Sequence, residues 1–92
     1  MDKTIETKTF IIKNELGLHA RAAAMLARES DRFESKIFFE KDGMEVDGRS
    51  LLDILTLACP KGARITIRAE GEDARNAIEG LGRLIEDKFG EN

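Results

Sequence analysis

The chain of 92 residues fits one small domain, 1–92, and folding at this size buries only about 60 to 65% of the unfolded surface, so we expect no deep internal pocket. Its 15 Lys and Arg against 18 Asp and Glu give a formal net charge of -3 without a basic run, which makes nucleic acid a poor candidate partner. The single cysteine, Cys59, and the single histidine exclude an internal disulfide framework and a recognisable set of zinc ligands.

The N-terminal residues, from Met1 to Glu6, lack the apolar stretch of a signal peptide. No apolar run elsewhere approaches the length that crosses a bilayer, and a lone cysteine suits a reducing compartment. We therefore expect a cytoplasmic protein with no membrane contact, no metal and no cofactor.

The first half of the chain predicts a strand, a helix and a hairpin. Residues 6–13 mix Thr, Phe and Ile with Lys and Glu, as in a half-buried strand, and the Ala-rich and Leu-rich stretch 20–33 predicts a helix. Residues 36–41 and 44–46 predict two strands, because Asp42-Gly43 between them is a strong hairpin turn. On one face of this helix lie Ala20, Ala23, Ala27 and the neighbouring Leu26.

The second half predicts a short helix, a strand and a long helix. Ser50 and Asp53 fit a capping box that opens an apolar helix ending before Pro60. Residues 64–70 alternate apolar and polar residues, which predicts a strand with one face on the core.

The last helix is predicted from Glu72 to about Phe89, with Glu72 and Asp73 placed to favour the helix dipole. Gly80 and Gly82 inside it each cost roughly 0.5 to 1 kcal/mol relative to Ala, so this helix must depend on tertiary packing. The order β-α-β-β-α-β-α closes most simply as an α+β fold, a four-stranded antiparallel sheet with three helices on one face. The apolar stripe of the last helix comprises Ala74, Ala77, Ile78, Leu81, Leu84 and Ile85.

The only histidine, His19, lies between the first strand and the first turn of the first helix. A helix N-terminus offers unpaired backbone N–H groups and the positive end of the dipole to a phosphate, and an imidazole nitrogen there can attack phosphorus. Gly17 allows a tight backbone approach, and the guanidinium of Arg21 can bridge two phosphoryl oxygens. Arg21 can meet His19 only if His19 lies outside the helix as its cap.

Two other classes of protein stay open at this point. In a small ligand-binding α/β module, His19 would be an ordinary surface or cap residue. An independent enzyme fits less well, because no hydrolytic triad motif accompanies His19 and the domain is too small for a substantial cleft. Covalent carriage of a phosphoryl group is the preferred interpretation.

The run Gly17-Leu18-His19-Ala20-Arg21-Ala22-Ala23 resembles the active-site signature of HPr, the histidine phosphocarrier family of the bacterial phosphotransferase system. The resemblance implies an open-faced β-sandwich and a carrier without turnover of its own. It further implies phosphorylation of His19 at Nδ1 by Enzyme I, using phosphoenolpyruvate, and onward transfer to an enzyme IIA domain. Further matches in the family's order are Asp42-Gly43, the segment from Val46 to Leu52, Lys61-Gly62 and Ile65-Thr66-Ile67.

Two residues depart from the family pattern. Ala22 stands where the signature usually carries proline, which costs about 0.4 to 1 kcal/mol of stability through the freer unfolded chain. Leu16 stands where some members place a small polar residue that can contact the imidazole, so the sequence identifies no side chain that orients the ring.

Ser50 is explained structurally as the N-cap of the short helix. By the resemblance, it is also the serine that HPr kinase/phosphorylase modifies in many bacteria, and the two roles are compatible. A phosphate there would place about -2 charge beside the surface that meets partners, which would reduce docking with Enzyme I.

A docking surface is expected on the short helix beside His19. Because a helix this short cannot bury every apolar side chain, we expect Leu51, Leu52 and Leu55 to be exposed, with Ile54 and Leu57 in the core. The docking surface of the family lies in the matching place, and Ala20 is expected to belong to it. We expect Arg21, Arg28 and Arg49 to ring this surface with positive charge that steers acidic partners, although Arg28 is equally explained as a solvated helix residue. Cys59 is expected to pack at the end of the helix, and the chain to act as a monomer. Both a sugar-uptake branch and a regulatory, nitrogen-type phosphorelay fit these residues.

Overall fold

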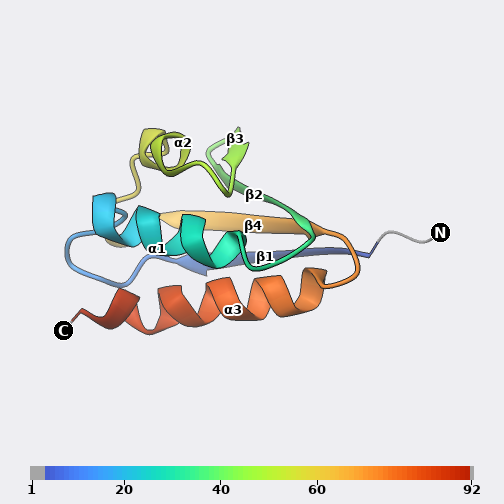
Figure 1. The fold of residues 1–92 in the computed structure, drawn as a ribbon. Helices are drawn as coiled ribbons and strands as arrows, with labels where there is room; N and C mark the ends of the chain where they lie inside the picture. The colour runs from blue at the N-terminus through green and yellow to red at the C-terminus, as the bar shows by residue number, and fades with distance from the viewer. Residues whose placement is uncertain (1–3, 92) are drawn as a thin grey trace.

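Four strands form one antiparallel sheet in the order β1-β4-β2-β3 (Figure 1). The computed structural model describes residues 4–91, so Met1 to Lys3 and Asn92 of the expected domain lie outside the described residues. In the register, Phe10 lies opposite Ile65 and Phe39 lies opposite Ile67. The strands are β1 (Ile5–Ile11), β2 (Lys36–Lys41), β3 (Met44–Asp47) and β4 (Arg64–Glu70).

The strand alternation and the hairpin predicted from the sequence are confirmed. Ile65, Ile67 and Ala69 of β4 are fully buried, while the residues between them are not. Asp42 and Gly43 have φ values of 52° and 86°, and two positive φ angles are what a two-residue hairpin turn requires.

Three helices cover one face of the sheet, which confirms the predicted α+β architecture. The helices are α1 (Ala20–Ser30), α2 (Leu51–Thr56) and α3 (Ala74–Glu86), and a single 3-10 turn, Lys88–Gly90, follows α3. Figure 1 shows α1 and α3 side by side across the sheet, with α2 next to α1.

The helix end predicted at Phe33 is wrong by a few residues, since α1 ends at Ser30, whereas α2 ends before Pro60 as predicted. After Ser30 the hydrogen bonds tighten to i→i-3, with Arg32 N–H donating to Glu29 O over 3.1 Å. The same spacing ends α2, where Ala58 N–H donates to Leu55 O over 3.2 Å and Ala58 has a φ of 51°. A left-handed residue cannot continue a right-handed helix, so the chain turns away at Ala58.

The start of α3 also differs from the prediction, because α3 begins at Ala74 rather than Glu72. The side chain of Asp73 makes no cap hydrogen bond; instead its carboxylate accepts from the hydroxyl of Ser35 and from the N–H groups of Glu34 and Ser35. These hydrogen bonds, that of the Ser35 hydroxyl first, hold the pKa of Asp73 below its usual range. Asp73 therefore ties the loop before β2 to the start of α3.

The predicted face of α1 is only partly buried. Ala23 and Leu26 are fully buried, as is Ala22, whereas Ala27 is half-buried and Ala20 is exposed. Because α1 packs against both α2 and α3, these contacts decide which of its residues are buried.

Gly82 of α3 allows close packing of this helix against Phe10 of the sheet. A Cβ at Gly82 would lie 2.5 Å from Cζ of the buried Phe10, so only glycine lets the ring approach α3. A Cβ at Gly80 would meet the carboxylate oxygen Oε2 of Glu29, the end of a flexible side chain that can move aside.

We predict opposite effects for the two Gly→Ala substitutions. Gly82→Ala should lower the free energy of unfolding by about 1 to 3 kcal/mol, because it overpacks the contact with Phe10. Gly80→Ala should leave it unchanged or raise it by up to about 1 kcal/mol, through the higher helix propensity of Ala. Urea unfolding followed by circular dichroism measures both, and a Gly82→Ala variant as stable as the unsubstituted chain would contradict this packing.

Candidate functional site

The loop that carries His19 is pinned to the segment following α2. Leu18 N–H donates to Cys59 O over 2.8 Å, and a Cβ at Gly17 would lie 2.5 Å from the same oxygen. Gly17 also has a φ of 66°, which favours glycine. The tight backbone approach predicted at Gly17 is thus confirmed.

His19 is the N-cap residue of α1, outside the helix. Its backbone is extended, with φ -76° and ψ 179°, and its carbonyl accepts from Ala23 N–H over 2.9 Å. The N–H groups of the first turn, which begins at the exposed Ala20, have no acceptor within the helix, and the ring of His19 makes no cap hydrogen bond to them. His19 therefore lies at the positive end of the α1 dipole, as the sequence predicts.

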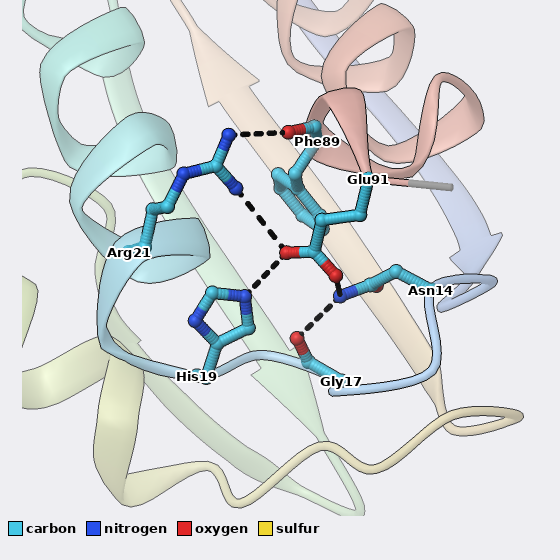
Figure 2. A network of polar contacts seen from close by, with 6 residues as sticks. All are labelled: Asn14, Gly17, His19, Arg21, Phe89 and Glu91. Atoms are coloured by element: carbon cyan, nitrogen blue, oxygen red, sulfur yellow. Dashed lines mark hydrogen bonds and ion pairs between the residues drawn. The ribbon is translucent and has the colours of Figure 1, made fainter.

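A carboxylate joins His19 to Arg21 (Figure 2). Nε2 of His19 contacts Oε2 of Glu91, and Nη1 of Arg21 donates to that oxygen over 3.2 Å. Nη2 of Arg21 donates to Phe89 O over 3.1 Å, and Nδ1 of His19 points away from Glu91. The sequence predicted that Arg21 can meet His19 only if His19 is the helix cap. His19 is the cap, and the two side chains are joined through the carboxylate of Glu91.

Glu91 is held from a third side by Asn14. The side-chain amide of Asn14, only 1% exposed, donates to Glu91 Oε1 over 3.1 Å and to Gly17 O over 2.7 Å. The hydrogen bond with His19, then that with Asn14 and the charge of Arg21, hold the pKa of Glu91 below its usual range. Glu91 is therefore ionised near neutral pH.

The segment after α3 brings Glu91 to this place, and the predicted helix end at Phe89 is wrong for the same reason. Lys88 and Phe89 both have a φ of 55°, which ends the helix and turns the chain back. Phe89 is fully buried, and Glu91 N–H donates to Lys88 O over 2.9 Å. Asn14, Phe89 and Glu91 were not predicted as site residues; the pair Phe89-Gly90 after an amphipathic helix is the one signal of a turn there.

Helix α2 carries the predicted regulatory and docking residues. Ser50 is its N-cap, and Ser50 Oγ accepts from Asp53 N–H over 3.2 Å, as predicted. Leu51 and Leu52 are 36% and 73% exposed, so these two form an exposed leucine pair. Leu55 does not join them as expected, since it is half-buried against the core, where Ile54 and Leu57 lie as predicted. Figure 1 shows α2 next to α1, and the chain leaving α2 meets the His19 loop at Leu18.

The side chains of the two other predicted docking arginines, Arg28 and Arg49, lie against residues other than the exposed leucine pair. Arg28 lines a shallow groove with Met25 and Leu84, between α1 and α3. Arg49 donates to Ser35 O over 3.1 Å and pairs with Asp31 at 3.3 Å, so its guanidinium holds the turn after α1. A role of either arginine in docking stays a prediction.

Cys59 packs in the core after α2, as predicted, and burial raises the pKa of its thiol. A thiol with a raised pKa is a poor nucleophile at neutral pH. Within residues 4–91, no three His, Cys, Asp or Glu side chains are grouped so as to hold a metal ion. No helix in this part of the chain is long and apolar enough to cross a membrane.

A family model described as the PTS HPr component phosphorylation site matches residues 6–87. A phosphocarrier protein HPr from Xylella fastidiosa is 38% identical over 82 residues, which cover 89% of this chain and 92% of that protein. A multiphosphoryl transfer protein from Haemophilus influenzae is 45% identical over 87 residues, 91% of this chain, but the match spans only 17% of that protein's length.

Solved structures of HPr proteins are also similar to this chain. HPr-C-His from Thermoanaerobacter tengcongensis superposes with a TM-score of 0.91 at 41% identity, covering 95% of this chain and 98% of that one. An HPr dimer from the same organism gives a TM-score of 0.76 at 43% identity, covering 89% and 94% of the two chains.

We predict that proline is accepted at position 22 and not at position 23, although both alanines are fully buried. Ala22 N–H lies in the first turn and has no acceptor within the helix, so Ala22→Pro should raise the free energy of unfolding by about 0.4 to 1 kcal/mol. Ala23→Pro removes the hydrogen bond to His19 O and should lower it by about 3 kcal/mol. Thermal and urea unfolding of the two variants test this; equal stabilities would show that the cap at His19 is not formed as described.

Proposed function

The chain belongs to the HPr family of the phosphotransferase system, and from this we propose that it is a phosphoryl carrier whose acceptor is His19. The observation that carries the proposal is the place of the imidazole, at the N-terminus of α1 with Nδ1 pointing away from the polar network. The side chain of His19 is 26% exposed, so a partner can reach the ring without any opening of the fold. As a carrier, the protein has no turnover of its own.

In the proposed transfer, the lone pair of Nδ1 attacks phosphorus. The Nδ1–P bond forms while the bond between phosphorus and the donor breaks, and the donor keeps that electron pair. The free N–H groups of the first turn of α1 and the helix dipole favour the phosphoryl charge. Arg21 can bind phosphoryl oxygens by exchanging Phe89 O and Glu91 for them, since a group with about -2 charge is the stronger acceptor.

The proposed donor is Enzyme I, charged by phosphoenolpyruvate, and the proposed acceptor is an enzyme IIA domain. Both would dock on the exposed leucine pair of α2 together with Ala20, next to the His19 loop. We place this exchange in the cytoplasm and propose that the chain acts as a monomer, because its sheet and core are completed within one chain.

The carrier role predicts one acid-labile phosphoryl adduct after incubation with Enzyme I, Mg²⁺ and phosphoenolpyruvate. His19→Ala should lose the adduct completely and keep its fold, because the ring makes no cap hydrogen bond. Intact-mass analysis before and after acid treatment measures this. A folded His19→Ala variant that still takes up the acid-labile group, or an unsubstituted chain that takes up none from a cognate Enzyme I, would reject the proposal.

We further propose that Ser50 is a regulatory site for HPr kinase/phosphorylase. Ser50 is half-buried, its Oγ accepts a hydrogen bond from Asp53 N–H, and it directly precedes the exposed leucine pair. A phosphate at Ser50 would add about -2 charge at the edge of the docking surface.

Ser50→Asp should slow the Enzyme I-dependent phosphorylation of His19 several-fold, because the added charge opposes docking. Ser50→Asn is the matched control: it keeps a good N-cap side chain without the charge and should react at the unsubstituted rate. With the kinase and ATP, an acid-stable adduct should form and be absent in Ser50→Ala. Equal rates for the Asp and Asn variants, or an adduct that persists in Ser50→Ala, would argue against the role.

A further inference from the structure

The contact between Glu91 and His19 fixes which ring nitrogen carries the proton. An ionised carboxylate only accepts hydrogen bonds, so Nε2, which contacts Glu91 Oε2, must be the donor. In the neutral ring the other nitrogen, Nδ1, then holds the free lone pair, and this is the nitrogen that points away from Glu91 in Figure 2. The Glu91 side chain thereby presents the nucleophile.

Charge develops on the ring once Nδ1 forms a bond to phosphorus. The proton stays on Nε2, so the ring of the phosphorylated residue carries a positive charge, and the donor leaves with the electron pair of the broken bond. A carboxylate on the far nitrogen stabilises that charge, as the aspartate of a Ser-His-Asp triad stabilises its imidazolium. We propose that Glu91 is a positioning residue for phosphoryl transfer at His19, which sets the tautomer and stabilises the charged ring; this inference rests on the proposed function.

Glu91 is built into the site rather than lying loosely on it. Its carboxylate is held by the buried amide of Asn14 and by Arg21, and its side chain is only 17% exposed. The fully buried Phe89, two residues earlier, anchors the segment. Asn14 from the loop after β1, His19 at the N-cap of α1 and Arg21 of α1 thus converge on one carboxylate.

No other described side chain contacts the His19 ring through a hydrogen bond. Leu16, at the position where the sequence left ring orientation open, is 69% exposed and has no polar atom to offer. Arg21 reaches the carboxylate and not the ring. Orientation of the imidazole therefore depends on Glu91.

The first test needs no phosphorylation. In a chain labelled with ¹⁵N-histidine at mildly alkaline pH, a ¹⁵N–¹H correlation of Nε2 should be visible, because the carboxylate protects that proton from exchange with water. Glu91→Ala should lose this correlation. Glu86→Ala is the matched control, since Glu86 belongs to the same end of the chain but pairs with Lys13 at the surface.

The second test follows the Enzyme I-dependent phosphorylation rate against donor concentration. Charge-assisted hydrogen bonds are about twice as strong as neutral ones, so Glu91→Gln should lower the rate at saturating donor roughly tenfold. The half-saturating donor concentration should not change, because the carboxylate faces away from the nitrogen that meets the partner. Glu86→Gln removes the same charge and should react at the unsubstituted rate.

The outcomes separate the inference from the proposed function. An unsubstituted chain that is phosphorylated at His19, with Glu91→Gln equally fast at saturating donor, overturns the inference and leaves the carrier role intact. The absence of the Nε2 correlation in the unsubstituted chain also overturns it. Failure of the unsubstituted chain to take up a phosphoryl group overturns the carrier role, and the positioning role falls with it even where the correlation is seen.

Discussion

The site depends on the backbone of Gly17, whose φ of 66° lets the loop after β1 press against Cys59 O. The hydrogen bond from Leu18 N–H to this oxygen fixes the direction in which the chain enters α1. His19 is then left extended as the N-cap, with its ring outside the helix and beside the unpaired N–H groups of the first turn. A side chain at position 17 would collide with backbone rather than with a flexible group, so the loop has no cheap alternative.

The positive potential at the site contrasts with the negative net charge of the whole chain. The net charge is -3, yet the dipole of α1 and Arg21 gather positive potential around the imidazole, and Glu91 balances it within the unphosphorylated protein. The carboxylate occupies the side of Nε2, so Nδ1 is left open toward a partner. One internal anion therefore neutralises Arg21, and in the proposed transfer a more highly charged phosphoryl group competes with it for the guanidinium.

The sequence predicted correctly those features that depend on residues close together in the chain. The alternation of Ile65, Ile67 and Ala69, the Asp42-Gly43 turn and the Ser50 cap each follow from residues close together in the chain, and so does the place of His19 before α1. The end of α3 was missed because Lys88 and Phe89 adopt positive φ without being glycine. Glu91 was missed because its partner His19 lies 72 positions away, and no periodicity reports such a pair.

Exposure of the proposed acceptor, His19, fits a carrier better than an enzyme. An enzyme encloses its reacting atoms to exclude water, whereas a carrier must offer the same nitrogen to two partners in turn and cannot enclose it. The side chain of His19 is 26% exposed, so in the proposed transfer the partner's surface has to complete the shielding in each encounter. What the chain itself can contribute to that transfer is orientation and fixed charge from the far side of the ring, where Glu91 lies, held by the buried amide of Asn14.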